Sequence, residues 1–111
     1  MSDYKSFDDI CNHACRIAKE CALTNATPTK VRNSITLVDT IMDYTCKNRD
    51  LLIERWFKLD YPIQEKRLAA GTAEDYLQYL LEHLHNEPGN TPETFKEWKK
   101  SSGLTGTFYS N

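Results

Sequence analysis

The sequence is poor in glycine and proline, the residues that most often interrupt helices. Each occurs four times in 111 residues, whereas an average protein has about 7% glycine and about 5% proline. Sandwiches and barrels built from many short strands need frequent turns, so this composition argues against them and favours long helices. There is no internal repeat or low-complexity segment, and 40% hydrophobic with 27% charged residues is normal for one globular domain.

A clear excess of either charge is also missing. The formal net charge is −2, and division after Asp60 gives nine basic and nine acidic residues before it, five basic and seven acidic after it. Phosphate binding normally shows as a basic excess or stripe, so this balance disfavours nucleic acid as a partner. The N-terminal residues MSDYKSFDD contain no apolar secretion segment, and no run approaches the roughly 18 apolar residues of a membrane span. We therefore expect a soluble, cytoplasmic protein with no membrane partner.

The short motifs that accompany many catalytic and metal sites are absent as well. The sequence contains no glycine-rich phosphate loop, no nucleophile-elbow serine and no paired-carboxylate motif. The histidines are His13, His83 and His85, and the last two point in directions too different for joint chelation from a helix. We therefore predict no catalytic residue, no metal and no cofactor, and we do not expect an enzyme.

The cysteines invite a metal interpretation that their spacing does not support. Cys11 and Cys15 would share one helix face, but His13 would project about 160–200° away from them. One ion could not readily reach all three side chains. We predict that Cys11, Cys15, Cys21 and Cys46 are reduced thiols in the core.

The longest uninterrupted helical pattern covers residues 28–59. Thr27 can cap its first N–H groups, and Pro28 suits the first helical position. Apolar side chains recur over an arc of about 200°, which indicates a helix covered on two sides. We predict one long central helix, and the alternative is a break near Asn48 within the polar run 47–50. The arc contains Val31, Ile35, Val38, Met42, Cys46, Ile53, Trp56 and Phe57, widened by Ile41, Leu52 and Leu59.

Arg49 falls inside this apolar arc, between Cys46 and Ile53. An unpaired charge there would be costly. Three interpretations stay open. The side chain snorkels out along its apolar stem, it marks a break between two helices, or it is a buried polar anchor that forms an interior ion pair or contacts a ligand.

Four shorter helices are predicted around the central one. The first begins at Ser6, which together with Asp9 resembles a capping box. Gly71 is interpreted as the C-terminal cap that separates the second from the third. The predicted fold is therefore all-α, a compact bundle of about five helices in one domain, 1–102, followed by an irregular C-terminal arm, 103–111. The four shorter helices cover residues 6–23, 62–70, 73–85 and 92–101.

Without a catalytic motif, the sequence favours a small binding protein of the inhibitor, immunity or adaptor type. It would act through contact with another protein or through self-association. Aromatic side chains are enriched at interface hot spots, and they supply the candidate surface. The predicted interface residues are Tyr76, Tyr79, His83, Trp98, Phe108 and Tyr109.

Two other functions stay open. Residues 17–35 resemble a degraded helix-turn-helix, as in a nucleic-acid or transcription-associated protein, although Ala22 occupies the position of the usual turn glycine. The second alternative is a small-ligand or nucleotide-binding protein with Arg49 or His83 as its anchor.

Overall fold

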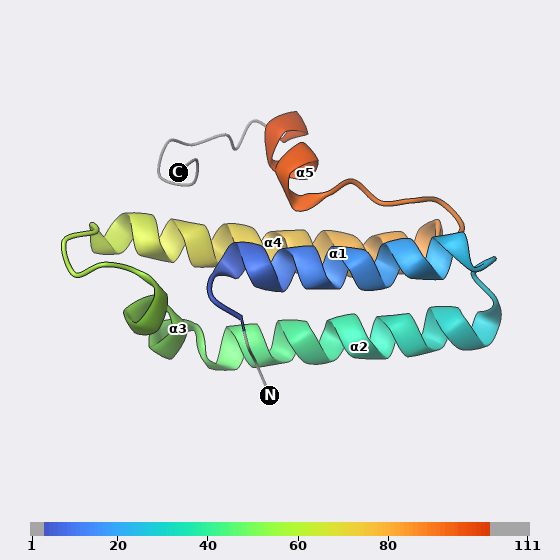
Figure 1. Cartoon of the computed structure of the whole chain (residues 1–111), viewed down its shortest axis with the longest axis horizontal. Helices are drawn as coiled ribbons and strands as arrows, with labels where there is room; N and C mark the ends of the chain where they lie inside the picture. The colour runs from blue at the N-terminus through green and yellow to red at the C-terminus, as the bar shows by residue number, and fades with distance from the viewer. Residues whose placement is uncertain (1–3, 103–111) are drawn as a thin grey trace.

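The computed structural model describes residues 4–102, and these form five α-helices and no strand. Helices α1, α2 and α4 run side by side, α3 lies at one end of the molecule, and α5 crosses above α1 and α4 (Figure 1). The predicted all-α bundle is therefore confirmed. None of the helices described is long and apolar enough to cross a membrane. The helices are α1 Phe7–Leu23, α2 Pro28–Lys47, α3 Arg49–Trp56, α4 Ile63–Asn86 and α5 Phe95–Ser101.

Helix α1 begins as predicted, because the Ser6 side chain accepts a hydrogen bond from the Asp9 N–H at 3.1 Å. Its apolar face is almost completely removed from solvent. At roughly 25 cal/mol per Å² of apolar surface, such a face contributes strongly to the stability of the bundle. The buried residues of α1 are Phe7, Ile10, Cys11, Ala14, Cys15, Ala18 and Cys21.

The turn between α1 and α2 reverses the chain. Asn25 and Ala26 have φ angles of 72° and 45°, in the left-handed region, and the Ala26 N–H donates to the Cys21 carbonyl at 3.0 Å. Thr27 caps α2, with Pro28 in its first turn as predicted. The two helices lie antiparallel (Figure 1), whereas the helices of a helix-turn-helix cross at about 90–120°. Residues 17–35 therefore do not have helix-turn-helix geometry.

The single helix predicted over residues 28–59 is wrong, because the chain breaks at Asn48. Helix α2 ends at Lys47 and α3 begins at Arg49. Both the backbone N–H and the side-chain amide of Asn48 donate to the Tyr44 carbonyl, at 3.1 and 2.8 Å. A side chain that bonds to the local backbone in this way competes with helix continuation. The helical pattern also ends early, at Trp56, since Phe57 is extended.

The central position belongs to α4, which packs against α1, α2 and α3. Ten of its 24 residues are buried, compared with three of the 20 in α2. The predicted C-terminal cap at Gly71 is wrong, because α4 continues through it. A helical glycine costs about 1 kcal/mol relative to alanine, and burial of the alanines beside it, Ala70 and Ala73, offsets that cost.

The continuity of α4 can be tested by Gly71→Ala. A Cβ at Gly71 would meet no atom within 4 Å, so the substitution should stabilise the protein by about 1 kcal/mol. The melting temperature, followed by circular dichroism, should rise by about 4–8 °C.

Gly89→Ala is the matched control, because it also meets no atom within 4 Å but lies in the turn after α4. Its effect should stay within about 0.5 kcal/mol. A loss of stability in Gly71→Ala would mean that the helix ends at this glycine.

Candidate functional site

Arg49, the predicted polar anchor, joins the break between α2 and α3 to the central helix. Its Nε donates to Glu74 Oε2 at 2.8 Å, and its Nη2 donates to Glu74 Oε1. The Glu74 side chain is 11% exposed and that of Arg49 is 45% exposed. The arrangement combines two of the proposed interpretations, a helix break and an ion pair. The hydrogen bonds to Glu74 raise the pKa of the Arg49 guanidinium, which therefore stays charged.

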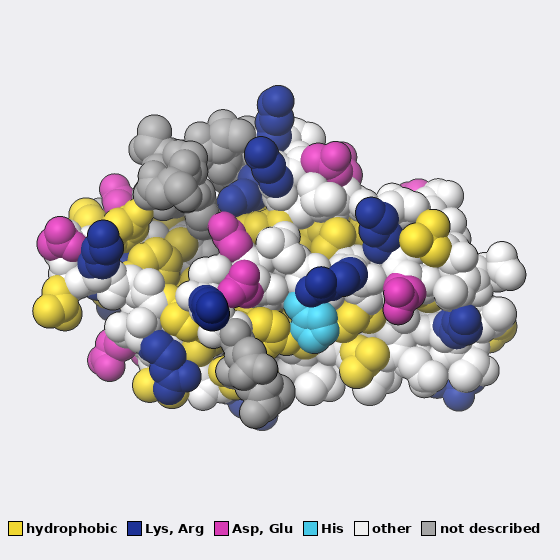
Figure 2. All heavy atoms as spheres, in the orientation of Figure 1, with side chains coloured by type: hydrophobic (Ala, Val, Ile, Leu, Met, Phe, Trp, Pro, Cys, Tyr) yellow, Lys and Arg dark blue, Asp and Glu magenta, His cyan; other side chains and the backbone are white. Residues whose placement is uncertain are grey.

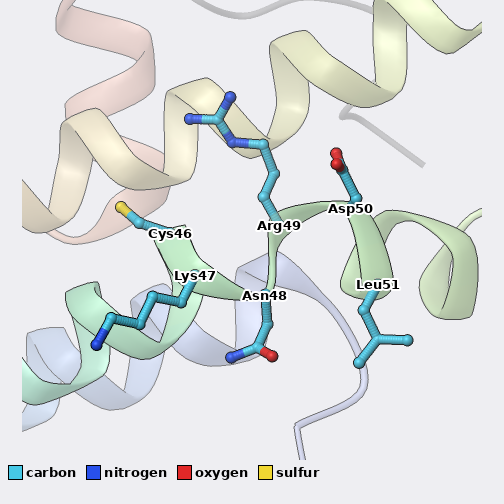
Figure 3. Close-up of a pocket in the computed structure, with 6 residues that line it drawn as sticks. All are labelled: Cys46, Lys47, Asn48, Arg49, Asp50 and Leu51. Carbon is cyan, nitrogen blue, oxygen red and sulfur yellow. The ribbon is translucent and has the colours of Figure 1, made fainter.

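An open hollow of about 270 Å³ lies beside Arg49, at the junction of α2 and α3. Figure 3 shows Arg49 reaching towards α4, while Lys47 and Leu51 point away from it. Lys47 pairs with Asp43 at 3.0 Å, so both cations of the hollow already have an acidic partner. The residues that line the hollow are Cys46, Lys47, Asn48, Arg49, Asp50 and Leu51.

The thiol of Cys46 in this hollow is exposed, so its predicted place in the core is wrong. The thiol lies close enough to the Glu74 carboxylate of α4 to interact with it, but at the edge of the helix contact, where solvent reaches it. Desolvation, together with the neighbouring Glu74 carboxylate, raises the pKa of the Cys46 thiol. The thiol is therefore protonated at neutral pH, which makes it a poor nucleophile.

The three cysteines of α1 are buried thiols, as predicted. The Cys11 and Cys15 thiols lie 3.7 and 3.8 Å from the carbonyls of Ala73 and Glu93. His13 contacts the Tyr4 hydroxyl through Nδ1 at 2.6 Å, away from the thiols. Among residues 4–102, no three His, Cys, Asp or Glu side chains come together in a way that could hold a metal ion.

Tyr76, from the predicted interface, lies in the core. It is fully buried, and its hydroxyl donates to the Glu93 carbonyl at 2.6 Å. Its ring lies 5.0 Å from that of Phe95 and 5.3 Å from that of Trp98, measured between centroids. Tyr76 therefore packs α5 against α4, and its side chain is not accessible to a partner.

Tyr79 and His83 hold the connection between α4 and α5. The Tyr79 hydroxyl accepts the Glu93 N–H at 3.0 Å, and His83 Nε2 lies 2.6 Å from the Asn90 carbonyl. Both side chains are half-buried, as is Trp98. The polar groups of Tyr79 and His83 form hydrogen bonds within the chain. The role of these residues at an interface stays a prediction. The other predicted interface residues, Phe108 and Tyr109, lie in the arm 103–111, outside the described residues.

Large hydrophobic side chains are exposed in two separate regions. Four of them, Leu51, Leu59, Ile63 and Leu68, lie on α3, on the loop after it and at the start of α4, a region that we call the apolar end. Leu59 is 100% exposed and the other three are 50–56% exposed. Figure 2 shows hydrophobic side chains on the left end of the molecule, with charged groups around them.

The second region is a groove between α1 and α2, with a volume of about 420 Å³. It lies towards the end where these helices are joined, opposite the apolar end (Figure 1). Leu23 and Leu37, the remaining exposed large hydrophobics of the described chain, stand on its walls. The groove is lined by Ile17, Glu20, Cys21, Leu23, Thr24, Lys30, Asn33, Ser34 and Leu37.

Neither region was predicted from the sequence. Leu59 was assigned to the buried arc, which is wrong, because the helix ends at Trp56 and the chain turns away from the core. Leu37 falls outside the predicted apolar arc. A leucine outside the apolar face of an amphipathic helix indicates an exposed hydrophobic side chain, and this was the signal that could have predicted the groove.

No protein-family model, curated protein or solved structure matches this chain.

The contribution of the ion pair can be measured with Glu74→Gln. This change removes the buried charge and leaves Arg49 without its counter-ion, so the free energy of unfolding should fall by about 1–2 kcal/mol. Urea denaturation is the measurement.

Asp43→Asn is the control, because it breaks the exposed Lys47–Asp43 pair, whose side chains are 73% and 60% exposed. That change should cost less than about 0.5 kcal/mol. Equal losses in the two variants would show that the Arg49–Glu74 contact does not stabilise the junction.

Stability should also depend on Tyr76 at alkaline pH. Burial raises the pKa of Tyr76 well above its ordinary value. The unfolded chain loses the phenol proton near pH 10, while the folded chain keeps it. The free energy of unfolding should therefore fall with a slope of about 1.4 kcal/mol per pH unit above about pH 10.

Tyr76→Phe cannot ionise and should lack that part of the slope, although it should lose about 1 kcal/mol at neutral pH with the hydrogen bond to Glu93. Urea denaturation between about pH 8 and about pH 11 compares the two proteins. Parallel pH profiles would contradict the assignment.

Proposed function

We propose that this protein binds another protein and that the apolar end is its contact surface. The observation behind the proposal is the concentration of exposed hydrophobics, since four of the six in the described chain lie between Leu51 and Leu68. A gathering of exposed hydrophobic side chains in one region is a feature of interaction sites on protein surfaces.

The surroundings of Leu59 support this role. The rings of Phe57 and Tyr61, two residues before and two residues after Leu59, pack together with centroids 5.4 Å apart and hold the ends of this short segment close to each other. The neighbouring Lys58 and Asp60 are exposed. An apolar centre inside a charged rim of mixed sign is the usual composition of a non-obligate interface.

The proposed occupant is a partner protein that presents an apolar surface of its own. The exposed charges around the apolar end are of both signs, so they favour neither a strongly acidic nor a strongly basic partner. They comprise Glu54, Arg55, Lys58, Asp60 and Arg67.

The alternatives receive less support. Arg49 and His83, the anchors suggested for a small ligand, are already bonded to Glu74 and to the Asn90 carbonyl. The nucleic-acid alternative depended on residues 17–35, whose two helices lie antiparallel (Figure 1).

The test substitutes Leu59→Asp together with Ile63→Asp. Both side chains are exposed, so circular dichroism should show an intact fold. Proteins captured from the native source by the unaltered chain should be lost, and the affinity for a purified partner should fall at least about 10-fold, as expected at a hot spot.

Leu23→Asp with Leu37→Asp is the matched control, because it adds the same charges to the groove. It should leave the affinity of a single copy for the purified partner unchanged. Capture of the same proteins by the Leu59→Asp, Ile63→Asp variant would contradict the proposal.

A further inference from the structure

The groove between α1 and α2 has two unlike walls. The α1 wall carries Glu20 and the exposed Leu23, and the α2 wall carries Lys30 and the exposed Leu37. Each wall therefore offers one leucine and one charge, and the charges are opposite in sign.

The floor of the groove is already closed. Cys21 is 3% exposed and Ser34 is 8% exposed. A closed floor between projecting leucines suits a side chain inserted from outside better than it suits a small molecule. An occupant would need an apolar side chain against each leucine. It would also need a positive charge near Glu20 and a negative charge near Lys30.

The same groove on a second copy of the chain has these features. We propose that two copies of the chain associate through the α1–α2 groove around a two-fold axis that runs along it. Such an axis lays α1 of each copy over α2 of the other. Leu37 then faces Ile17 of the second copy, and Glu20 is brought towards Lys30 of the second copy.

Two-fold symmetry is the reason to choose a second copy over an unrelated helix. An isologous contact uses the same patch twice, so the patch must be complementary to itself. A patch with Glu20 on one wall and Lys30 on the other meets this condition, because rotation about the groove axis exchanges the walls. A groove with one sign of charge would not.

This contact is independent of the proposed partner surface. The apolar end and the groove lie at opposite ends of the molecule (Figure 1). Substitutions in one region therefore leave the other intact, and each proposal can fail without the other.

The experiment is a charge exchange followed by analytical ultracentrifugation over a range of protein concentrations at low salt. Glu20→Lys gives both walls a positive charge, and Lys30→Glu gives both a negative charge. Both positions are exposed, so the fold should be unaffected. Each variant places like charges opposite each other twice in the dimer and should weaken dimerisation at least about 10-fold.

Two recombinations make the test specific for a second copy. The double variant Glu20→Lys with Lys30→Glu should dimerise like the unaltered chain. An equimolar mixture of the two single variants should form a mixed dimer, because each supplies the charge that the other lacks.

Leu37→Ser should weaken the dimer without changing the charge, while Leu59→Ser should leave it unchanged. A protein that stays monomeric up to about 1 mM would overturn the proposal. So would a dimer that persists in the charge-reversed variants, or one that Leu59→Ser abolishes, since the contact would then lie elsewhere.

Discussion

The fold depends on the burial of α4 on several sides at once. Helices α1 and α2 cover part of its surface, and the aromatic contacts of Tyr76 with α5 cover another part. Leu77, Leu80 and Leu84 are fully buried in consequence. Because hydrophobic burial is the dominant favourable term in folding, the helices around α4 are arranged to complete this cover.

That constraint explains the break in the chain at Asn48. A straight helix through residues 28–59 would run beyond the surface that α4 offers. The turn at Asn48 instead brings Leu52 and Ile53 into the core, and Arg49 neutralises the buried Glu74 as the chain changes direction. The polar run 47–50 is thus where the chain changes direction.

Local patterns predicted the parts of the fold that depend on neighbouring residues. The cap at Ser6, the proline in the first turn of α2 and the buried thiols of α1 all follow from spacing within a few residues. The continuity of α4 through Gly71 could not be predicted in this way, because it depends on packing against helices distant in sequence. Tyr76 was mistaken for a surface residue for the same reason, since its hydroxyl binds the Glu93 carbonyl across the α4–α5 connection. The candidate site escaped prediction because Leu59 is exposed only if the helix ends at Trp56.

The separation of the apolar end from the groove along one helical body has a consequence for valency. In a pair joined at the groove, the two-fold axis runs along the helices, so both apolar ends would lie at the same end of the pair and form two equivalent docking points side by side. A target with repeated binding sites at a matching spacing would then be retained by both points together, and avidity would compensate for weak individual contacts. A target with a single site would gain nothing from the pairing. The molecule would thereby distinguish assembled targets from dispersed ones.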